Sequence, residues 1–378
     1  MKHLTSIHME VSMKILQDQT KFAPDTPVTQ QLFTQSSLFF DIETTGFSPS
    51  HTYVYLIGCA FRHNDKICLT QFFAENPQEE EQILSAFLKM LSGYKNLISY
   101  NGMGFDVHYL KERCALYGLA ESLDKFDHLD IYRKLSKFKP ILKLENMKQK
   151  SLEKFLDIER EDKYSGGELI QIYLNYTEQR SEEALSQLLL HNYEDILGMT
   201  MLLPLLSYCR LFEGGFEVTS YEKNIYAAFD GQQEQELIFT LSPEFSLPKR
   251  FSFGLRQIYL TGFQQQAKLK IPLYQGELKH FYPNYKDYYY LPEEDRAIHK
   301  SVALYTDRHY RTKAKATTCY IRKTGIFLPQ YQELITPCFK QEYEDKISWF
   351  PLTKEFLSSN AQQKNYIAHI LKRLSDHG

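Results

Sequence analysis

The first part of the chain alternates short apolar runs with segments whose apolar residues recur at helical spacing. Four runs of strand length are bounded by turn-forming residues, and they cover residues 38–42, 54–61, 66–73 and 96–100. Apolar residues follow a helical period over residues 78–91 and 105–117, and Gly118 ends the second segment. The order of three strands, a helix, a strand and a helix predicts an α/β domain.

The remainder of the chain predicts a different organisation. After residue 131 the pattern is mainly helical, with a capping box from Ser165 to Glu168 and a long helix from Ser181 to near Pro204. From residue 216 short apolar stretches alternate with Pro and Gly, which predicts a strand-rich region, and residues 365–374 predict an amphipathic helix. We therefore expect a polar lead-in segment over residues 1–37, an α/β domain over 38–210 and a smaller α+β accessory domain over 216–378.

Composition places the chain among soluble globular proteins. It has 378 residues, 43% of them hydrophobic and 24% charged, which favours two folded domains over disorder. No uninterrupted apolar run approaches the roughly 18–20 residues of a membrane span, and no basic stretch precedes an apolar one near the N-terminus. A cytoplasmic location is therefore expected. The six cysteines are scattered without metal-binding spacing, which argues against a zinc site.

Charge is divided unevenly along the chain. Through Gly215 there are 22 Lys and Arg against 29 Asp and Glu, whereas the remainder has 22 against 18. The basic excess is concentrated between Arg296 and Lys323, where eight Lys and Arg accompany one acid and three tyrosines, Tyr305, Tyr310 and Tyr320. This stretch is either a solvated face or a phosphate-tracking surface with aromatic platforms. The acidic first half favours the second interpretation, because a basic region would hold nucleic acid near carboxylates that repel it.

Asp41 and Glu43 end the first predicted strand. Side chains two residues apart on a strand point to the same face, so these two carboxylates would converge. At such a distance one of them would hold a proton unless a cation lies between them. The alternative is an ordinary exposed acidic strand end.

Two further acids strengthen the interpretation as a metal site. Asp106 follows a Gly-rich loop at the carboxyl end of a predicted strand, where open α/β sheets place their ligands. Asp195 lies four residues after His191, so both occupy one face of the long predicted helix. Carboxylate oxygens are the ligands that Mg²⁺ and Mn²⁺ prefer.

Three motifs occur in order along this region: Asp41-Ile42-Glu43-Thr44-Thr45-Gly46, then Asn101-Gly102 with Phe105-Asp106, then His191 to Asp195. Together they resemble the motifs of the DEDD exonucleases, which have a ribonuclease H-like fold. The resemblance is closest to the YprB-like branch of bacterial predicted exonucleases and covers about Leu38 to Leu206.

The resemblance implies a ribonuclease H-like mixed sheet flanked by helices and a 3′→5′ exonuclease that hydrolyses phosphodiester bonds of DNA or RNA. It implies that two Mg²⁺ or Mn²⁺ ions, about 4 Å apart, are held by four carboxylates, those of Asp41, Glu43, Asp106 and Asp195. His191 would accept a proton from the attacking water. Thr44, Asn101 and Phe105 would lie where the 3′-terminal nucleotide of a single strand enters, and Phe105 would stack on a base or belong to the core.

One departure from the family leaves an alternative open. DEDD subgroups have Tyr four residues, or His five residues, before the last Asp, whereas here His191 is at the tyrosine spacing. A nucleic-acid-binding protein that retains the fold but turns over weakly or not at all is therefore the second hypothesis. A carboxylate-pair glycosidase is more distant, because it needs two acids rather than four.

Overall fold

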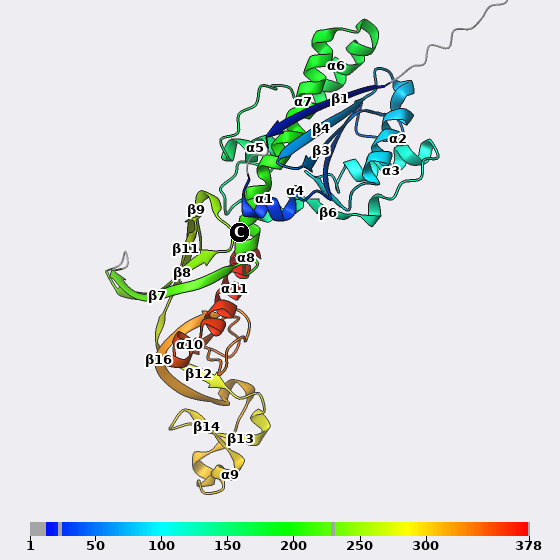
Figure 1. Ribbon diagram of the computed structural model, residues 1–378. Helices are drawn as coiled ribbons and strands as arrows, with labels where there is room; N and C mark the ends of the chain where they lie inside the picture. Colours follow the sequence, from blue (N-terminus) through cyan, green and yellow to red (C-terminus); the bar gives the residue numbers. More distant parts are fainter. Residues whose placement is uncertain (1–12, 22–24, 228–230, 377–378) are drawn as a thin grey trace, which may run out of the picture. The chain divides into compact units, whose positions relative to one another are not determined.

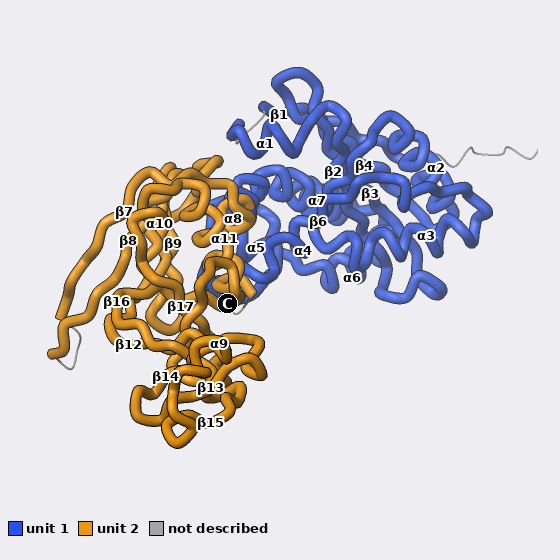
Figure 2. Tube along the Cα trace, turned by 90° about the horizontal axis from the view of Figure 1, so that it is seen from below, with its two compact units in different colours: residues 1–209 blue, residues 210–378 orange. Residues whose placement is uncertain are grey.

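The computed structural model describes residues 13–21, 25–227 and 231–376 (Figure 1). By its internal contacts the chain divides into two compact units, residues 1–209 and 210–378, which are coloured separately in Figure 2. The predicted boundary lay between residues 210 and 216. Residues 1–12 and 22–24 of the predicted lead-in segment lie outside the described residues.

A six-stranded mixed sheet forms the centre of unit 1. Its spatial order is β1-β4-β3-β2-β5-β6, with β2, β5 and β6 parallel to one another and the remaining neighbours antiparallel. The strands are β1 Lys14–Lys21, β2 Ser37–Thr44, β3 Val54–His63, β4 Lys66–Phe73, β5 Asn96–Ser99 and β6 Asp127–Asp130. The mixed sheet places the carboxyl ends of β2 and β5 at the same edge.

Helices cover both faces of this sheet (Figure 1). The helices in this part of the chain are α1 Pro27–Leu32, α2 Glu80–Leu91, α3 Asp106–Leu116, α4 Ile131–Leu135, α5 Gln149–Phe155, α6 Gly166–Gln179 and α7 Glu182–Leu202, and α8 Leu206–Phe212 contains the boundary between the units. One hydrophobic cluster joins Phe40 of β2 to Phe87 of α2 and Leu110 of α3. A second joins the other face to α6 and α7, for example Phe73 to Tyr173. The predicted arrangement, a mixed sheet flanked by helices, is confirmed.

Regular structure begins earlier than the sequence predicted. The expectation that residues before 38 form only a lead-in segment is wrong for 14–21 and 27–32, which form β1 and α1. β1 is an edge strand that pairs with β4 along its whole length, and most of its side chains are polar. The predicted capping box is confirmed, since Glu168 Oε2 accepts from the Ser165 backbone N–H at 2.8 Å where α6 begins.

The helical stretch from α7 to α8, Glu182–Phe212, is long and apolar enough by composition to cross a membrane. Such length was not expected from the sequence, because charged residues and Pro204 interrupt the apolar run. Of its most apolar window, 78% is buried inside the protein, as in the core helix of a globular domain.

Unit 2 is rich in strands, as predicted. A five-stranded antiparallel sheet in the order β7-β8-β11-β10-β9 is followed by two three-stranded sheets, β12-β16-β17 and β14-β13-β15. Its strands are β7 Phe216–Ala227, β8 Gln233–Pro243, β9 Leu247–Leu255, β10 Ile258–Gln264, β11 Gln266–Pro272, β12 Tyr274–Phe281, β13 Tyr288–Leu291, β14 Arg296–His299, β15 Thr312–Lys313, β16 Tyr320–Gln330 and β17 Ser348–Pro351. Its helices are α9 Lys300–Ala303, α10 Lys354–Ser358 and α11 Asn360–Asp376. The predicted amphipathic helix is α11, which buries Ile367, Ile370 and Leu371.

Candidate active site

The two carboxylates of β2 face helix α7. Asp41 Oδ2 accepts a hydrogen bond from Asn192 Nδ2 at 3.2 Å, and Glu43 Oε1 lies 3.6 Å from His191 Nε2. Gln71 on β4 donates to Asn192 Oδ1 at 3.0 Å, which turns the amide N–H₂ of Asn192 toward Asp41. Both side chains therefore point to one face of the sheet, as the spacing along the strand predicted.

Asp106 joins them from the neighbouring strand. It is the first residue of α3, a few residues after β5, and β5 runs parallel to β2. Its buried carboxylate accepts a hydrogen bond from the backbone N–H of Ile42, between the two acids of β2. The Gly-rich loop thus brings the predicted third carboxylate to the edge where β2 ends.

The loop that precedes Asp106 is held by a residue that the sequence analysis did not single out. Asp130, at the end of β6, accepts from the backbone N–H groups of Asn101 at 3.0 Å and Met103 at 3.1 Å. Asn101 has a left-handed backbone, with φ of 61°. A Cβ on Gly102 would lie 2.4 Å from Ser99 Oγ and 3.2 Å from Asp106 Oδ2, so this position admits only glycine without a shift.

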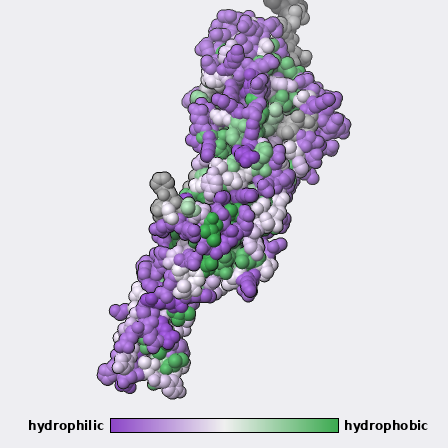
Figure 3. Space-filling model, turned by 90° about the vertical axis from the view of Figure 1, so that its left-hand side faces the viewer, coloured by the Kyte–Doolittle hydropathy of each residue, from purple (hydrophilic) through white to green (hydrophobic). Residues whose placement is uncertain are grey.

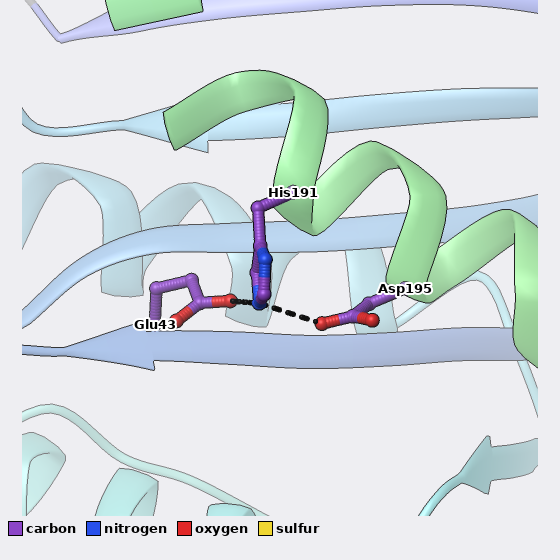
Figure 4. A group of neighbouring side chains, drawn as sticks. All are labelled: Glu43, His191 and Asp195. Carbon is purple, nitrogen blue, oxygen red and sulfur yellow. Dashed lines mark ion pairs between the residues drawn. The ribbon is translucent and has the colours of Figure 1, made fainter. Parts of the chain in front are cut away.

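His191 and Asp195 come from one face of α7, as predicted. His191 Nε2 lies 3.1 Å from Asp195 Oδ2, so the imidazole lies between Asp195 and Glu43 (Figure 4). One ligand atom from each of these three residues lies within 4.8 Å of the others. This is a spacing at which three groups can share one cation.

The other ring nitrogen of His191 is held by Asp162, which the sequence analysis missed. His191 Nδ1 lies 2.8 Å from Asp162 Oδ2, and Lys150 Nζ donates to the same oxygen at 2.8 Å. An ionised carboxylate accepts hydrogen bonds, so Nδ1 carries a proton here and Nε2 is the nitrogen that faces the acidic cluster.

Arg160 was also missed. Its guanidinium donates to Asp195 Oδ1 at 2.6 Å and to Glu153 Oε2 at 3.2 Å, and its Nε lies 3.4 Å from Glu194 Oε2. Both Arg160 and Glu153 are almost fully shielded from solvent. No pattern in the sequence around Arg160 indicates these partners, because they lie up to 35 residues away along the chain.

Burial and mutual repulsion change the acidity of the cluster. Burial, followed by the charges of neighbouring acids, raises the pKa of Asp41 and of Glu43 well above the usual range. Burial raises the pKa of Asp106 to about 7 although backbone N–H groups oppose it. Burial also acts on Asp195, but His191 and Arg160 outweigh it and lower the pKa of this carboxyl.

The pKa of His191 shifts in the opposite direction to that of Asp195. Burial disfavours the imidazolium, but hydrogen bonds and charge from Asp195 and Asp162 outweigh it and raise the pKa of His191. Four convergent carboxylates, three of them with raised pKa values, form a donor set that suits a hard divalent cation.

The residues predicted to contact nucleic acid lie beside this cluster. Thr44 Oγ1 donates to the Gly46 carbonyl at 2.8 Å, and Asn101 is exposed. Phe105 is half-buried against the α2–α3 core, and its ring meets the exposed ring of Phe47 edge to face at 6.3 Å between centroids. Phe47 was not singled out from the sequence.

Comparison with known proteins agrees with this fold. Residues 38–207 match the model of a family described as the RNase_H superfamily, so the predicted ribonuclease H-like fold of unit 1 is confirmed. No curated protein matches the chain.

Solved structures with similar regions include a family B DNA polymerase from the archaeon Pyrobaculum calidifontis, with 17% identity over 47% of this chain and 26% of the polymerase, and a TM-score of 0.38. They also include E. coli exonuclease I in complex with a dT13 oligonucleotide, with 12% identity over 56% of this chain and 55% of the exonuclease, and a TM-score of 0.32. The similar regions thus span about a quarter and about half of these two proteins.

Proposed function

We propose that this chain is a divalent-metal-dependent 3′→5′ exonuclease of the DEDD type that acts on single strands of DNA or RNA. The observation that supports it most is the convergence of Asp41, Glu43, Asp106 and Asp195 in one ribonuclease H-like unit. Acids held this close either retain protons or share a cation, and a bound divalent ion would allow all four to ionise. The direction of cleavage is proposed from the resemblance of the three motifs.

These four carboxylates would hold two Mg²⁺ or Mn²⁺ ions, since both metals prefer oxygen ligands. When bound, such ions stabilise developing charge on phosphate oxygens and lower the pKa of a coordinated water. The pKa values of Asp41 and Glu43, raised by burial and by neighbouring acids, support this proposal, because a divalent ion would relieve the repulsion between the ionised groups.

His191 is the proposed proton acceptor. Asp162 holds the proton on Nδ1, which leaves Nε2 directed at the carboxylate cluster. Asp195 and Asp162 favour the protonated form of the His191 ring. A divalent ion held by Asp195 would offset the charge of this carboxylate, and Nε2 would then be free to accept a proton from an attacking water. Asp162 is therefore a proposed positioning residue for His191.

The terminal nucleotide would lie beside the β2–α3 edge. The edge-to-face rings of Phe47 and Phe105 offer an aromatic surface for a base, and the exposed amide of Asn101 lies in the same loop as Phe105. Thr44, at the end of β2, would contact the backbone of that nucleotide.

The second candidate is a nucleic-acid-binding protein without turnover. Two observations favour it: His191 stands at the tyrosine spacing, and the guanidinium of Arg160 already occupies Asp195 Oδ1 at 2.6 Å. If Arg160 keeps that carboxylate from a metal ion, the site would bind a strand without cleaving it.

Cleavage of 5′-labelled single-stranded DNA and RNA with Mg²⁺ or Mn²⁺ tests the two candidates. We expect a ladder that shortens from the 3′ end and that is lost with EDTA, with Asp41→Asn and with Asp106→Asn. Glu112→Gln is the matched control, because Glu112 lies on the same helix as Asp106 but has a half-exposed side chain that pairs with His108. Cleavage that survives Asp106→Asn would refute the proposed site. A retarded band without cleavage would establish the second candidate.

A further inference from the structure

A loop in unit 2 exposes aromatic and aliphatic side chains to solvent. It covers residues 300–315 and is called the α9 loop below. Tyr305 is 92% exposed and Tyr310 55% exposed, and Val302 and Leu304 are exposed as well. Figure 3 shows small apolar areas within the hydrophilic surface of the part of unit 2 that carries β13, β14 and α9 in Figure 1. Several exposed apolar side chains on one loop are a candidate binding surface, unlike a single exposed residue.

The loop is anchored although its rings are exposed. The backbone N–H of Thr306 donates to the Ala303 carbonyl at 3.2 Å, and that of Tyr310 donates to the Asp307 carbonyl at 3.1 Å. The guanidinium of Arg311 donates to the Ala303 carbonyl and also lies 4.9 Å above the ring of Tyr289. The Arg311 guanidinium thus joins residues 303 and 311, so the backbone segment that carries Tyr305 and Tyr310 is anchored on both sides.

Other tyrosines nearby are used for packing. The rings of Tyr282 and Tyr288 stack at 4.6 Å, and Tyr290 contacts the same small core. Tyr320 is only 6% exposed and its hydroxyl donates to Asp295 at 2.5 Å, so the expectation that it is an aromatic platform is wrong. It lies on β16, where its ring packs against Phe281. Tyr305 and Tyr310 remain as the exposed rings of the basic stretch.

Uncompensated positive charge accompanies these rings. Arg308, Lys313 and Lys315 are exposed, and within the described part of the chain they form no ion pair. The single acid of the stretch, Asp307, is paired with His309 at 2.9 Å. The loop therefore presents free cations together with exposed rings.

We propose that the α9 loop binds single-stranded nucleic acid, with bases stacked on Tyr305 and Tyr310 and phosphates paired with Arg308 and Lys313. Exposed rings favour single strands, because only unpaired bases offer a free face. Unpaired cations favour a polyanion over an apolar protein partner. The choice of nucleic acid rests on the proposed function, but binding here does not require that the site in unit 1 be active.

Fluorescence anisotropy with a labelled 20-nucleotide strand, in EDTA to prevent cleavage, tests the proposal on the full-length protein. Tyr305→Ala and Tyr310→Ala should each weaken binding about 5- to 100-fold, as expected for the loss of one stacked base, and the double replacement should weaken it further, by at least about 30-fold. Phe at both positions should retain most of the affinity, since it keeps the ring. Arg308→Ala with Lys313→Ala should weaken binding and reduce its salt dependence. Tyr221→Ala with Lys223→Ala is the matched control, because both residues are exposed on β7 of the same unit.

A second assay distinguishes strand binding by the α9 loop from nuclease activity at the carboxylate cluster. Loop variants should still hydrolyse a small phosphodiester, the p-nitrophenyl ester of thymidine 5′-phosphate, whereas Asp106→Asn should abolish that hydrolysis and leave strand binding in EDTA intact. Equal affinity of the Tyr→Ala variant and the wild type would overturn the loop proposal. Wild-type protein that binds anionic phosphatidylserine vesicles but no strand would replace it with a membrane surface. Because Tyr305 and Tyr310 are exposed, we expect both variants to fold, which circular dichroism checks.

Discussion

At the scale of single residues, three acids of the site, Asp41, Glu43 and Asp106, retain protons at pH values where carboxyls in water have lost them. The pKa of Asp106 is raised to about 7 by burial, and repulsion adds to burial at Asp41 and Glu43. In the metal-free protein the stability contributed by protonated Asp106 is present below its unfolded pKa and is lost as pH rises toward 7. A cation that needs the ionised form has the opposite dependence, because it competes with protons for the same oxygens.

We therefore predict that Mg²⁺ stabilises the protein more at pH 8 than at pH 6. At Mg²⁺ about 100-fold above its dissociation constant, the midpoint of thermal unfolding should rise by about 5–10 °C at pH 8 and by much less at pH 6. Asp106→Asn should remove most of this shift, while its own metal-free stability at pH 8 equals or exceeds that of the wild type. Thermal unfolding at three pH values measures both. If Mg²⁺ raised the midpoint of thermal unfolding equally at all pH values, the carboxyls with raised pKa values would not be the metal ligands.

Arg160 gives a second prediction at this scale. Arg160→Ala leaves the buried carboxylate of Glu153 and that of Asp195 without their cation, so the free energy of unfolding should fall by about 3–5 kcal/mol. Arg160→Lys keeps the charge but cannot reach both acids with a planar fork, so its loss should be smaller. Chemical denaturation in EDTA measures this. Arg180→Ala, which removes a half-exposed ion pair with Glu75, should cost less than about 1 kcal/mol, and an equal loss in both variants would contradict the argument.

At the scale of elements, the sequence predicted what is encoded locally. The strands β2, β3, β4 and β5 have apolar runs, and α7 follows a capping residue, so pattern alone located them. The edge strand β1 and the four-residue strand β6 are largely polar, and their pairing with β4 and β5 defines them as strands. Local patterns cannot show that pairing.

The same reason explains which side chains of the site were anticipated. Asp41, Glu43, Asp106, His191 and Asp195 stand at strand ends or on one helix face, which a sequence displays. Asp130, Asp162 and Arg160 act through partners 27 to 35 residues away, so only the folded chain reveals them.

The β5–α3 loop supplies a prediction for an element. Gly102→Ala places a Cβ 2.4 Å from Ser99 Oγ and 3.2 Å from Asp106 Oδ2, so the loop must shift and Asp106 with it. We expect a loss of about 1–3 kcal/mol in the free energy of unfolding and a larger proportional loss of metal-induced stabilisation. Gly167→Ala in α6 is the control, because its Cβ would meet nothing within 4 Å. If the two variants keep the same Mg²⁺-dependent shift, Gly102 has no part in holding Asp106.

At the scale of the whole molecule, the two units carry opposite charge. The acidic excess lies in the sequence up to Gly215, which contains the carboxylate cluster, and the basic excess follows it. A polyanion is repelled by the first and attracted by the second. When each ligand is added alone, metal ions should therefore bind unit 1 and nucleic acid should bind unit 2. Hydrogen exchange on the intact chain can show which unit each ligand protects.

We predict that Mg²⁺ alone slows exchange in peptides over residues 100–110 and at the end of β2, whereas a single strand in EDTA slows exchange over the α9 loop. Each ligand stabilises the native form of the segment it binds, so local opening there becomes rarer. Asp106→Asn should abolish only the first effect, and Tyr305→Ala with Tyr310→Ala only the second. Strand-induced protection that stays in unit 1 and persists in the loop variant would place the main binding surface at the carboxylate cluster, because the ligand would then find its contacts without the exposed rings.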